Sequence, residues 1–167
     1  GAGTVVLIGT RDYRLDAAKG ADVKLNVGGG ESKYACSNLN ETIQELNGGE
    51  LPRSVIVATG AGAAIEQGWE LGVLGSTVVL YGQMADETTF THKSQPGLFN
   101  DKTLRYSWLA PNTWHEAMAL VKNGLVRVEA MHTHSCGLDG ISEAIVTQAE
   151  RRDNCIKYLV EVGGELS

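Results

Sequence analysis

The chain has 167 residues, of which 43% are hydrophobic and 20% charged, and its formal net charge is −6. This composition predicts a globular protein with a hydrophobic core of its own. The acidic balance argues against a general nucleic-acid or anionic-membrane surface, no apolar stretch approaches membrane-spanning length, and no signal peptide precedes the first predicted strand.

The first predicted element is a strand over Thr4–Ile8, a continuous apolar run that is typical of a parallel strand buried on both faces. Gly9 ends this run, and a helix is expected over residues 13–19. Asp12 is the expected N-cap, because its carboxylate can accept hydrogen bonds from amides of the first helical turn. This order of strand, glycine and helix indicates an α/β fold.

The turn after this strand is the first candidate binding site, since open α/β sheets bind ligands at the carboxyl ends of their strands. It presents Gly9, Thr10 and Arg11. Gly9 carries no carboxylate that would repel a phosphate, and an arginine here suits the 2′-phosphate of NADP. The alternative is a surface arginine after an ordinary strand-to-helix turn.

Strand-like and helix-like segments alternate along the rest of the chain. Further strands are expected over 23–27 (an edge strand), 54–58, 77–82, 103–109 and 155–162, helices over 38–46, 63–74, 113–123 and 138–151, an extended segment over 125–135, and a loop over 83–100. Asn38 and Thr113 are the expected N-caps of their helices, Asn38 together with Glu41. The alternation predicts an α/β fold with a mostly parallel sheet.

Apolar side chains at helical spacing are expected to face the core. They are Ile65 and Trp69 in one helix, Trp114, Met118 and Val121 in the next, and Ile141, Ile145 and Ala149 in the last. Charged pairs and triplets at Asp101–Lys102 and Arg151–Asp153 are expected to lie on the solvated surface.

Several short stretches, taken in their order and spacing, resemble one family. They are Gly9–Leu15, Gly20–Asp22 with Asn26–Val27, Ala58–Gly60 with Ala64–Gln67, Gly75–Gly82, Glu116–Ala117 with Gly124, Thr133–His134 with Leu138, and Asn154–Lys157. Together they resemble the coenzyme-binding domain of the medium-chain, zinc-type alcohol and polyol dehydrogenases. The resemblance implies a Rossmann-type fold, a partial NAD(P)-binding domain over residues 1–167, and NADP or NAD as coenzyme.

The resemblance also implies the residues that contact the coenzyme. Gly9, Thr10 and Arg11 would lie at the adenosine ribose, with Thr10 and Arg11 binding the 2′-phosphate. Thr59, Gly60 and Gly82 would lie near the ribose on the nicotinamide side, and Lys157 matches a basic position near the coenzyme. A solvated lysine at 157 is an equally good interpretation.

The sequence departs from the family at its start, because it begins at what resembles the second strand. The first strand, its glycine-rich turn and the N-terminal domain that holds the catalytic zinc are not in the sequence, and Gly1–Ala2–Gly3 precedes a strand instead of following one. We therefore expect an incomplete sheet, zinc only in the missing domain, and an inactive isolated chain. Unpaired strand edges would require the missing segment, another chain or self-association into a homo-oligomer.

The expected function is the NAD(P)-binding part of an enzyme that transfers hydride between a secondary alcohol and nicotinamide. The alternatives are a zinc-independent NADPH reductase of the same superfamily and a non-catalytic nucleotide-binding or assembly module. Three cysteines without metal-type spacing favour reduced thiols in the cytoplasm.

Two further motifs leave alternatives open. Gly60–Ala61–Gly62 follows a strand and precedes a helix, as a phosphate-binding turn does, but Ile65 stands where that motif has a small residue. His132, His134 and Cys136 alternate, so on a strand they would share one face and zinc is conceivable, although no fourth ligand is evident. Ordinary strand residues are the alternative.

Overall fold

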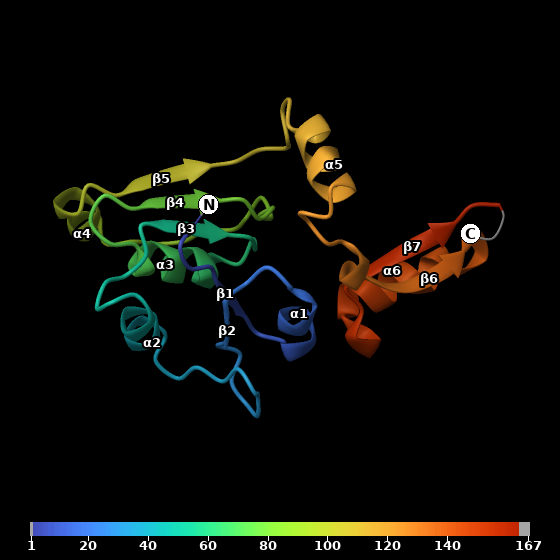
Figure 1. The fold of residues 1–167 in the computed structure, drawn as a ribbon, viewed down its shortest axis with the longest axis horizontal. Coiled ribbons are helices and arrows are strands. Elements are labelled where there is room, and N and C mark those ends of the chain that lie inside the picture. The colour runs from blue at the N-terminus through green and yellow to red at the C-terminus, as the bar shows by residue number, and fades with distance from the viewer. Residues whose placement is uncertain (1, 164–167) are drawn as a thin grey trace. The chain divides into compact units, whose positions relative to one another are not determined.

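The computed structural model describes residues 2–163, so Gly1 of the Gly1–Ala2–Gly3 stretch lies outside the described residues. The chain divides into two compact units, whose helices and strands are labelled in Figure 1. Unit 1 comprises Gly1–Ser37 and Asn112–Ser167, and unit 2 comprises Asn38–Pro111. The predicted α/β fold is confirmed, and the described strands pair in parallel, although they form three small sheets. None of the described helices is long and apolar enough to cross a membrane.

The N-terminal part of unit 1 is a strand–helix–strand motif of β1 (Val6–Gly9), α1 (Asp12–Ala17) and β2 (Val23–Asn26). The two strands pair from Val6 opposite Val23 to Gly9 opposite Asn26. Leu15 of α1 and Leu25 of β2 are buried, which explains why α1 packs on this pair of strands. Strand β1 is half-buried throughout, so it is less deeply covered than its apolar run predicts.

Unit 2 is a three-stranded parallel sheet with helices. Its elements are α2 (Leu39–Leu46), β3 (Ser54–Val57), α3 (Gly62–Leu71), β4 (Thr77–Leu80), α4 (Ser94–Phe99) and β5 (Thr103–Tyr106), and the strand order is β3-β4-β5. Helix α3 lies on one face of this sheet (Figure 1). Ile65 and Trp69 of α3 form the core with Val57, Val78 and Leu80, as predicted for the helical pair.

The rest of unit 1 contains α5 (Trp114–Lys122), β6 (His132–Gly137), α6 (Ile141–Glu150) and β7 (Lys157–Glu161), with short 3-10 turns at Glu129–Met131, Leu138–Gly140 and Arg152–Asn154. β6 and β7 form a parallel pair with an irregularity between His132 and His134. Among the described strands, β1 pairs only with β2 and β3 only with β4.

Helix α4 corrects the prediction of a loop over 83–100. Its sequence contains Pro96 and Gly97, which are poor helix formers, so local propensity gives no helix signal. Within this helix Gly97 packs against the Trp69 ring, so closely that a Cβ at residue 97 would be 2.7 Å from Cζ2. Lys102 is a second correction, because it is half-buried and its Nζ donates to the Trp69 carbonyl oxygen at 2.8 Å. Burial lowers the Lys102 pKa.

The apolar stripes of α5 and α6 are also predicted wrongly. Trp114 is 69% exposed and Met118 57% exposed, and no residue of α5 is buried. In α6 the buried residues are Ala144 and Thr147, whereas Ile145 is 64% exposed. Helical spacing places side chains on one face, but burial also requires another element to cover that face.

The predicted N-caps differ in outcome. The Asn38 side chain accepts a hydrogen bond from the Glu41 amide and donates one to the Glu41 carboxylate, so this cap is confirmed. Thr113 precedes α5 without making a side-chain capping bond. Asp12 does not cap α1 either, because its carboxylate is bound to residues outside the helix.

Candidate functional site

The turn after β1 leaves three predicted site residues open to solvent or partly so. Gly9 ends the strand, and a Cβ there would be 3.1 Å from Leu15 Cδ2, which is tighter than ordinary contact. Thr10 and Arg11 are exposed. Arg11 is the extended residue before α1, and its carbonyl accepts bonds from the Arg14 and Leu15 amides at 3.2 Å. Within the part of the chain that the structure describes, the Arg11 guanidinium has no hydrogen-bond or ion-pair partner.

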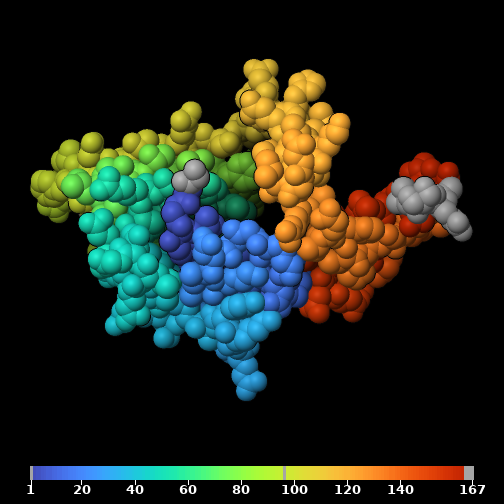
Figure 2. Space-filling model, in the orientation of Figure 1, coloured from blue at the N-terminus to red at the C-terminus, as the bar shows by residue number. Residues whose placement is uncertain are grey.

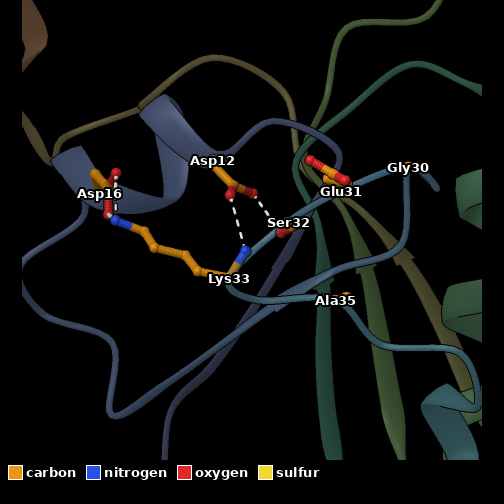
Figure 3. Close-up of a pocket in the computed structure, with 7 residues that line it drawn as sticks. All are labelled: Asp12, Asp16, Gly30, Glu31, Ser32, Lys33 and Ala35. Atoms are coloured by element: carbon orange, nitrogen blue, oxygen red, sulfur yellow. Dashed lines mark hydrogen bonds and ion pairs between the residues drawn. The ribbon is translucent and has the colours of Figure 1, made fainter.

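The Asp12 carboxylate joins α1 to the loop that follows β2 (Figure 3). Its Oδ1 accepts from Asn26 Nδ2 and from Ser32 Oγ, both at 2.6 Å, and its Oδ2 accepts from the Lys33 amide at 3.2 Å. Hydrogen bonds from Ser32 and then Asn26 lower the pKa of Asp12, because they stabilise the ionised form. Asp12 is therefore a charged anchor directly beside Arg11. We call Asp12 and its three donors, from Asn26, Ser32 and the Lys33 amide, the Asp12 clasp.

Asn26 of the clasp is connected to Thr10 through Gly28. The Asn26 side chain is buried, and its Oδ1 accepts the Gly28 amide at 2.8 Å. Gly28 in turn lies against the backbone of Thr10, where a Cβ would be 2.8 Å from the Thr10 carbonyl oxygen. The Val27 amide donates to the Gly9 carbonyl at 2.9 Å. The turn after β1 is thus held on one side by the loop after β2, which projects from the molecular surface (Figure 2, light blue).

A second set of contacts fixes the far end of this loop. Lys33 Nζ forms an ion pair with Asp16 at 2.8 Å, and the Tyr34 hydroxyl donates to Asp16 Oδ1 at 2.6 Å. Lys33 and then Tyr34 lower the pKa of Asp16, and the Asp16 bond raises the Lys33 pKa. Asp12, Asp16 and Glu31 outnumber Lys33 around the hollow in Figure 3, so that hollow is unsuited to a phosphate.

Three predicted site residues meet in unit 2, at the carboxyl ends of β3 and β4. Thr59 follows β3, and its Oγ1 accepts the Ala61 amide at 3.4 Å. A Cβ at Gly60 would collide with the Gln83 carbonyl oxygen, and a Cβ at Gly82 would collide with the backbone of Thr59. The two loops therefore pack backbone against backbone, which explains why glycine is needed at both positions.

The structure bears on the Gly60–Ala61–Gly62 turn but does not test the role of Lys157. At Gly60–Ala61–Gly62, a Cβ on Gly62 would collide with the Thr89 carbonyl oxygen, so an electronegative group already lies beside the start of α3 and disfavours a phosphate there. Lys157 is exposed and begins β7, and its role stays an expectation of the resemblance.

The zinc interpretation receives no support from the geometry around β6. His132 Nε2 lies 2.8 Å from Ser135 Oγ, and His134 Nδ1 lies 2.9 Å from Thr133 Oγ1. Among residues 2–163, no group of three or more His, Cys, Asp or Glu side chains is arranged to hold a metal ion.

Sequence reasoning missed the clasp around Thr10 and Arg11. The sequence predicts that Asp12 caps its own helix, and it places Asn26 at a strand end and Gly28 and Ser32 in a loop. The available signal was the run of glycines and polar residues at 28–33, placed directly after a strand that neighbours the candidate turn. Nothing in the spacing indicates which donors the Asp12 carboxylate selects.

The curated proteins to which the chain is similar include dehydrogenases of polyols. No family model matches the chain. It is 31% identical over 151 residues to sorbitol dehydrogenase of Pongo abelii, covering 88% of this chain and 40% of that protein. It is 22% identical over 161 residues to L-arabinitol 4-dehydrogenase of Aureobasidium melanogenum, covering 96% and 43%. The chain therefore spans about two fifths of the length of these curated relatives.

Solved structures agree on the fold. An alcohol dehydrogenase from Thermotoga maritima matches with a TM-score of 0.83 at 20% identity, over 96% of this chain and 43% of that one. A short chain alcohol dehydrogenase from Escherichia coli CFT073, complexed with NADH, matches at 0.77 and 22% identity over 96% and 45%. A putative zinc-binding dehydrogenase from Sinorhizobium meliloti 1021, bound to NADP, matches at 0.80 and 22% identity over 97% and 46%.

Proposed function

Because the chain is related to the zinc-type alcohol and polyol dehydrogenases and resembles their coenzyme-binding part, we propose that it binds a nicotinamide dinucleotide for a dehydrogenase of alcohols or polyols. The neighbours that were solved with NADH and with NADP support a nicotinamide coenzyme. The substrate of the whole protein would be an alcohol or polyol, as in the named relatives.

The turn after β1 carries the proposal that the coenzyme is NADP. Gly9 leaves the strand end without a carboxylate, Thr10 is exposed and carries a hydroxyl, and Arg11 is exposed, with its guanidinium unpaired within residues 2–163. A guanidinium can hold a phosphate by two parallel hydrogen bonds. These groups fit the 2′-phosphate of NADP better than they fit the 2′-hydroxyl of NAD, for which a carboxylate is the usual partner.

The chain's own residues would bind and orient the coenzyme. Thr10 and Arg11 would hold the adenosine end, while Thr59, Gly60 and Gly82 would line the path of the nicotinamide-side ribose. The close backbone packing at Gly60 and Gly82 supports this role, because it keeps the two loops rigid without side chains that would obstruct a ligand. The coenzyme itself supplies the hydride chemistry.

The test is the binding of NADPH and NADH to the chain, measured by isothermal titration calorimetry. We expect tighter binding of NADPH, and we expect Arg11→Ala to weaken NADPH binding by about tenfold or more, since a charge-assisted pair is lost, while NADH binding changes little. Lys19→Ala, which removes an exposed cation of the same unit, is the matched control. Equal losses of both coenzymes in Arg11→Ala would refute the NADP assignment, and a chain that binds neither would refute coenzyme binding.

A further inference from the structure

We propose that the Asp12 clasp positions Arg11 and thereby determines the preference for a 2′-phosphorylated nucleotide. This inference rests on the proposed function, and it adds positioning residues that do not themselves touch the nucleotide. Three observations carry it: the adjacency of Asp12 to Arg11, the three donors gathered on the Asp12 carboxylate, and the contact of Gly28 with Thr10.

The clasp determines where the Arg11 backbone lies. Arg11 has an extended conformation before α1, and its side chain has no partner within the described residues, so nothing on the guanidinium itself fixes its place. The neighbouring carboxylate is instead bound to Asn26 of β2 and to Ser32 and the Lys33 amide of the following loop. Because Asn26 is buried, this anchor is rigid on the strand side.

The same hydrogen bonds stabilise the negative charge of Asp12 on the side of the loop after β2. An ionised carboxylate next to Arg11 would repel a phosphate in the absence of other groups. Here the carboxylate oxygens face an amide, a hydroxyl and a backbone N–H, all of which are donors. The negative charge is therefore directed at the loop, and the Arg11 guanidinium does not pair with it.

These two roles of Asp12 predict opposite results for Asp12→Asn. If Asp12 acts only as a nearby negative charge, removing the charge strengthens phosphate binding. If Asp12 positions Arg11, the variant weakens phosphate binding, because an amide NH₂ would face donors where the carboxylate accepts from them. Ser32→Ala removes one donor while Asp12 keeps its charge, so it tests positioning alone.

The experiment measures the dissociation constants of adenosine 2′,5′-bisphosphate and 5′-AMP by calorimetry, with the whole chain. The ratio of the two constants is the 2′-phosphate preference. We expect this preference to fall about threefold to tenfold in Asp12→Asn and less in Ser32→Ala, a partial loss compared with Arg11→Ala. Asp22→Asn is the matched control, since Asp22 also loses a carboxylate charge but bonds the Val5 amide near the opposite end of β1.

The outcomes distinguish a failure of the Asp12 clasp from a failure of the proposed NADP binding. A preference that is lost in Arg11→Ala but kept or increased in Asp12→Asn overturns the clasp and leaves the proposed function standing. A wild-type chain without any 2′-phosphate preference overturns the proposed NADP function, and the clasp inference with it. Faster hydrogen exchange of the Lys33 amide in Asp12→Asn, with circular dichroism unchanged, is expected as a ligand-free readout, and an unchanged Lys33 rate overturns the clasp.

Discussion

Gly28→Ala tests whether the loop after β2 really closes on Thr10. Gly28 does not have a positive φ, so alanine adds no backbone strain there and the cost in the folded state is steric. The new Cβ would lie 2.8 Å from the Thr10 carbonyl oxygen, 2.9 Å from Thr10 Cβ and 3.0 Å from Thr10 Cα. Moving from 2.8 Å to an ordinary 3.4 Å requires a shift of about 0.6 Å, and two of these three atoms are backbone.

We expect this variant to destabilise the strand–loop contact by about 1–2 kcal/mol, in the lower part of the range for overpacking, because Gly28 is exposed and its loop can yield. Hydrogen exchange of the Val27 amide, which donates to Gly9, should then be about 5–30-fold faster. The Tyr81 amide of unit 2 is the internal reference. Gly20→Ala is the control, because a Cβ there would meet nothing within 4 Å. Unchanged Val27 exchange in Gly28→Ala would show that the loop does not rest on Thr10.

The remaining predictions concern stability. Ile65→Ala should destabilise unit 2 by about 2–5 kcal/mol, because Ile65 is 1% exposed in the core around Trp69, and urea unfolding followed by Trp69 fluorescence in a Trp108→Phe, Trp114→Phe background measures it. Asn38→Ala should cost about 1 kcal/mol, seen as faster amide exchange in α2 only. The hydrogen bonds that lower the Asp12 pKa stabilise the folded state, and this contribution is complete at pH values above the unfolded pKa near 3.8. It is lost as the pH falls below 3.8 and through the lower pKa of the folded state. Acid should therefore increase Lys33 amide exchange relative to its intrinsic rate, and Asp12→Asn should abolish this effect.

The sequence predicts the elements whose signal is local. Strands such as Ser54–Val57 and Thr77–Leu80 are short apolar runs ended by turn residues, and the Asn38 cap is a pattern of four residues. Features that depend on distant contacts were missed. Helix α4 contains Pro96 and Gly97, which give no local helix signal, and its Gly97 packs against the distant Trp69. Lys102 is drawn from the expected surface position to the Trp69 carbonyl.

In the candidate site, too, the local feature could be predicted from the sequence and the distant contacts could not. The turn of Gly9, Thr10 and Arg11 was identifiable because the end of a parallel strand is a known place for ligands and residue charge is visible in the sequence. The partners of Asp12 were not identifiable, since a carboxylate before a helix has its own amides available, and only the folded loop offers Asn26 and Ser32 as better-placed donors. Asn26 and Ser32 lie 14 and 20 residues from Asp12 in the sequence.

The contact between the loops after β3 and β4 has a consequence for protein engineering. Each loop leaves room for the other only because residues 60 and 82 lack side chains. In a chimaera with a related dehydrogenase, a crossover point between these two positions would combine loops that follow different paths. The pair must be exchanged as one module, and recombination breakpoints belong before β3 or after Gln83.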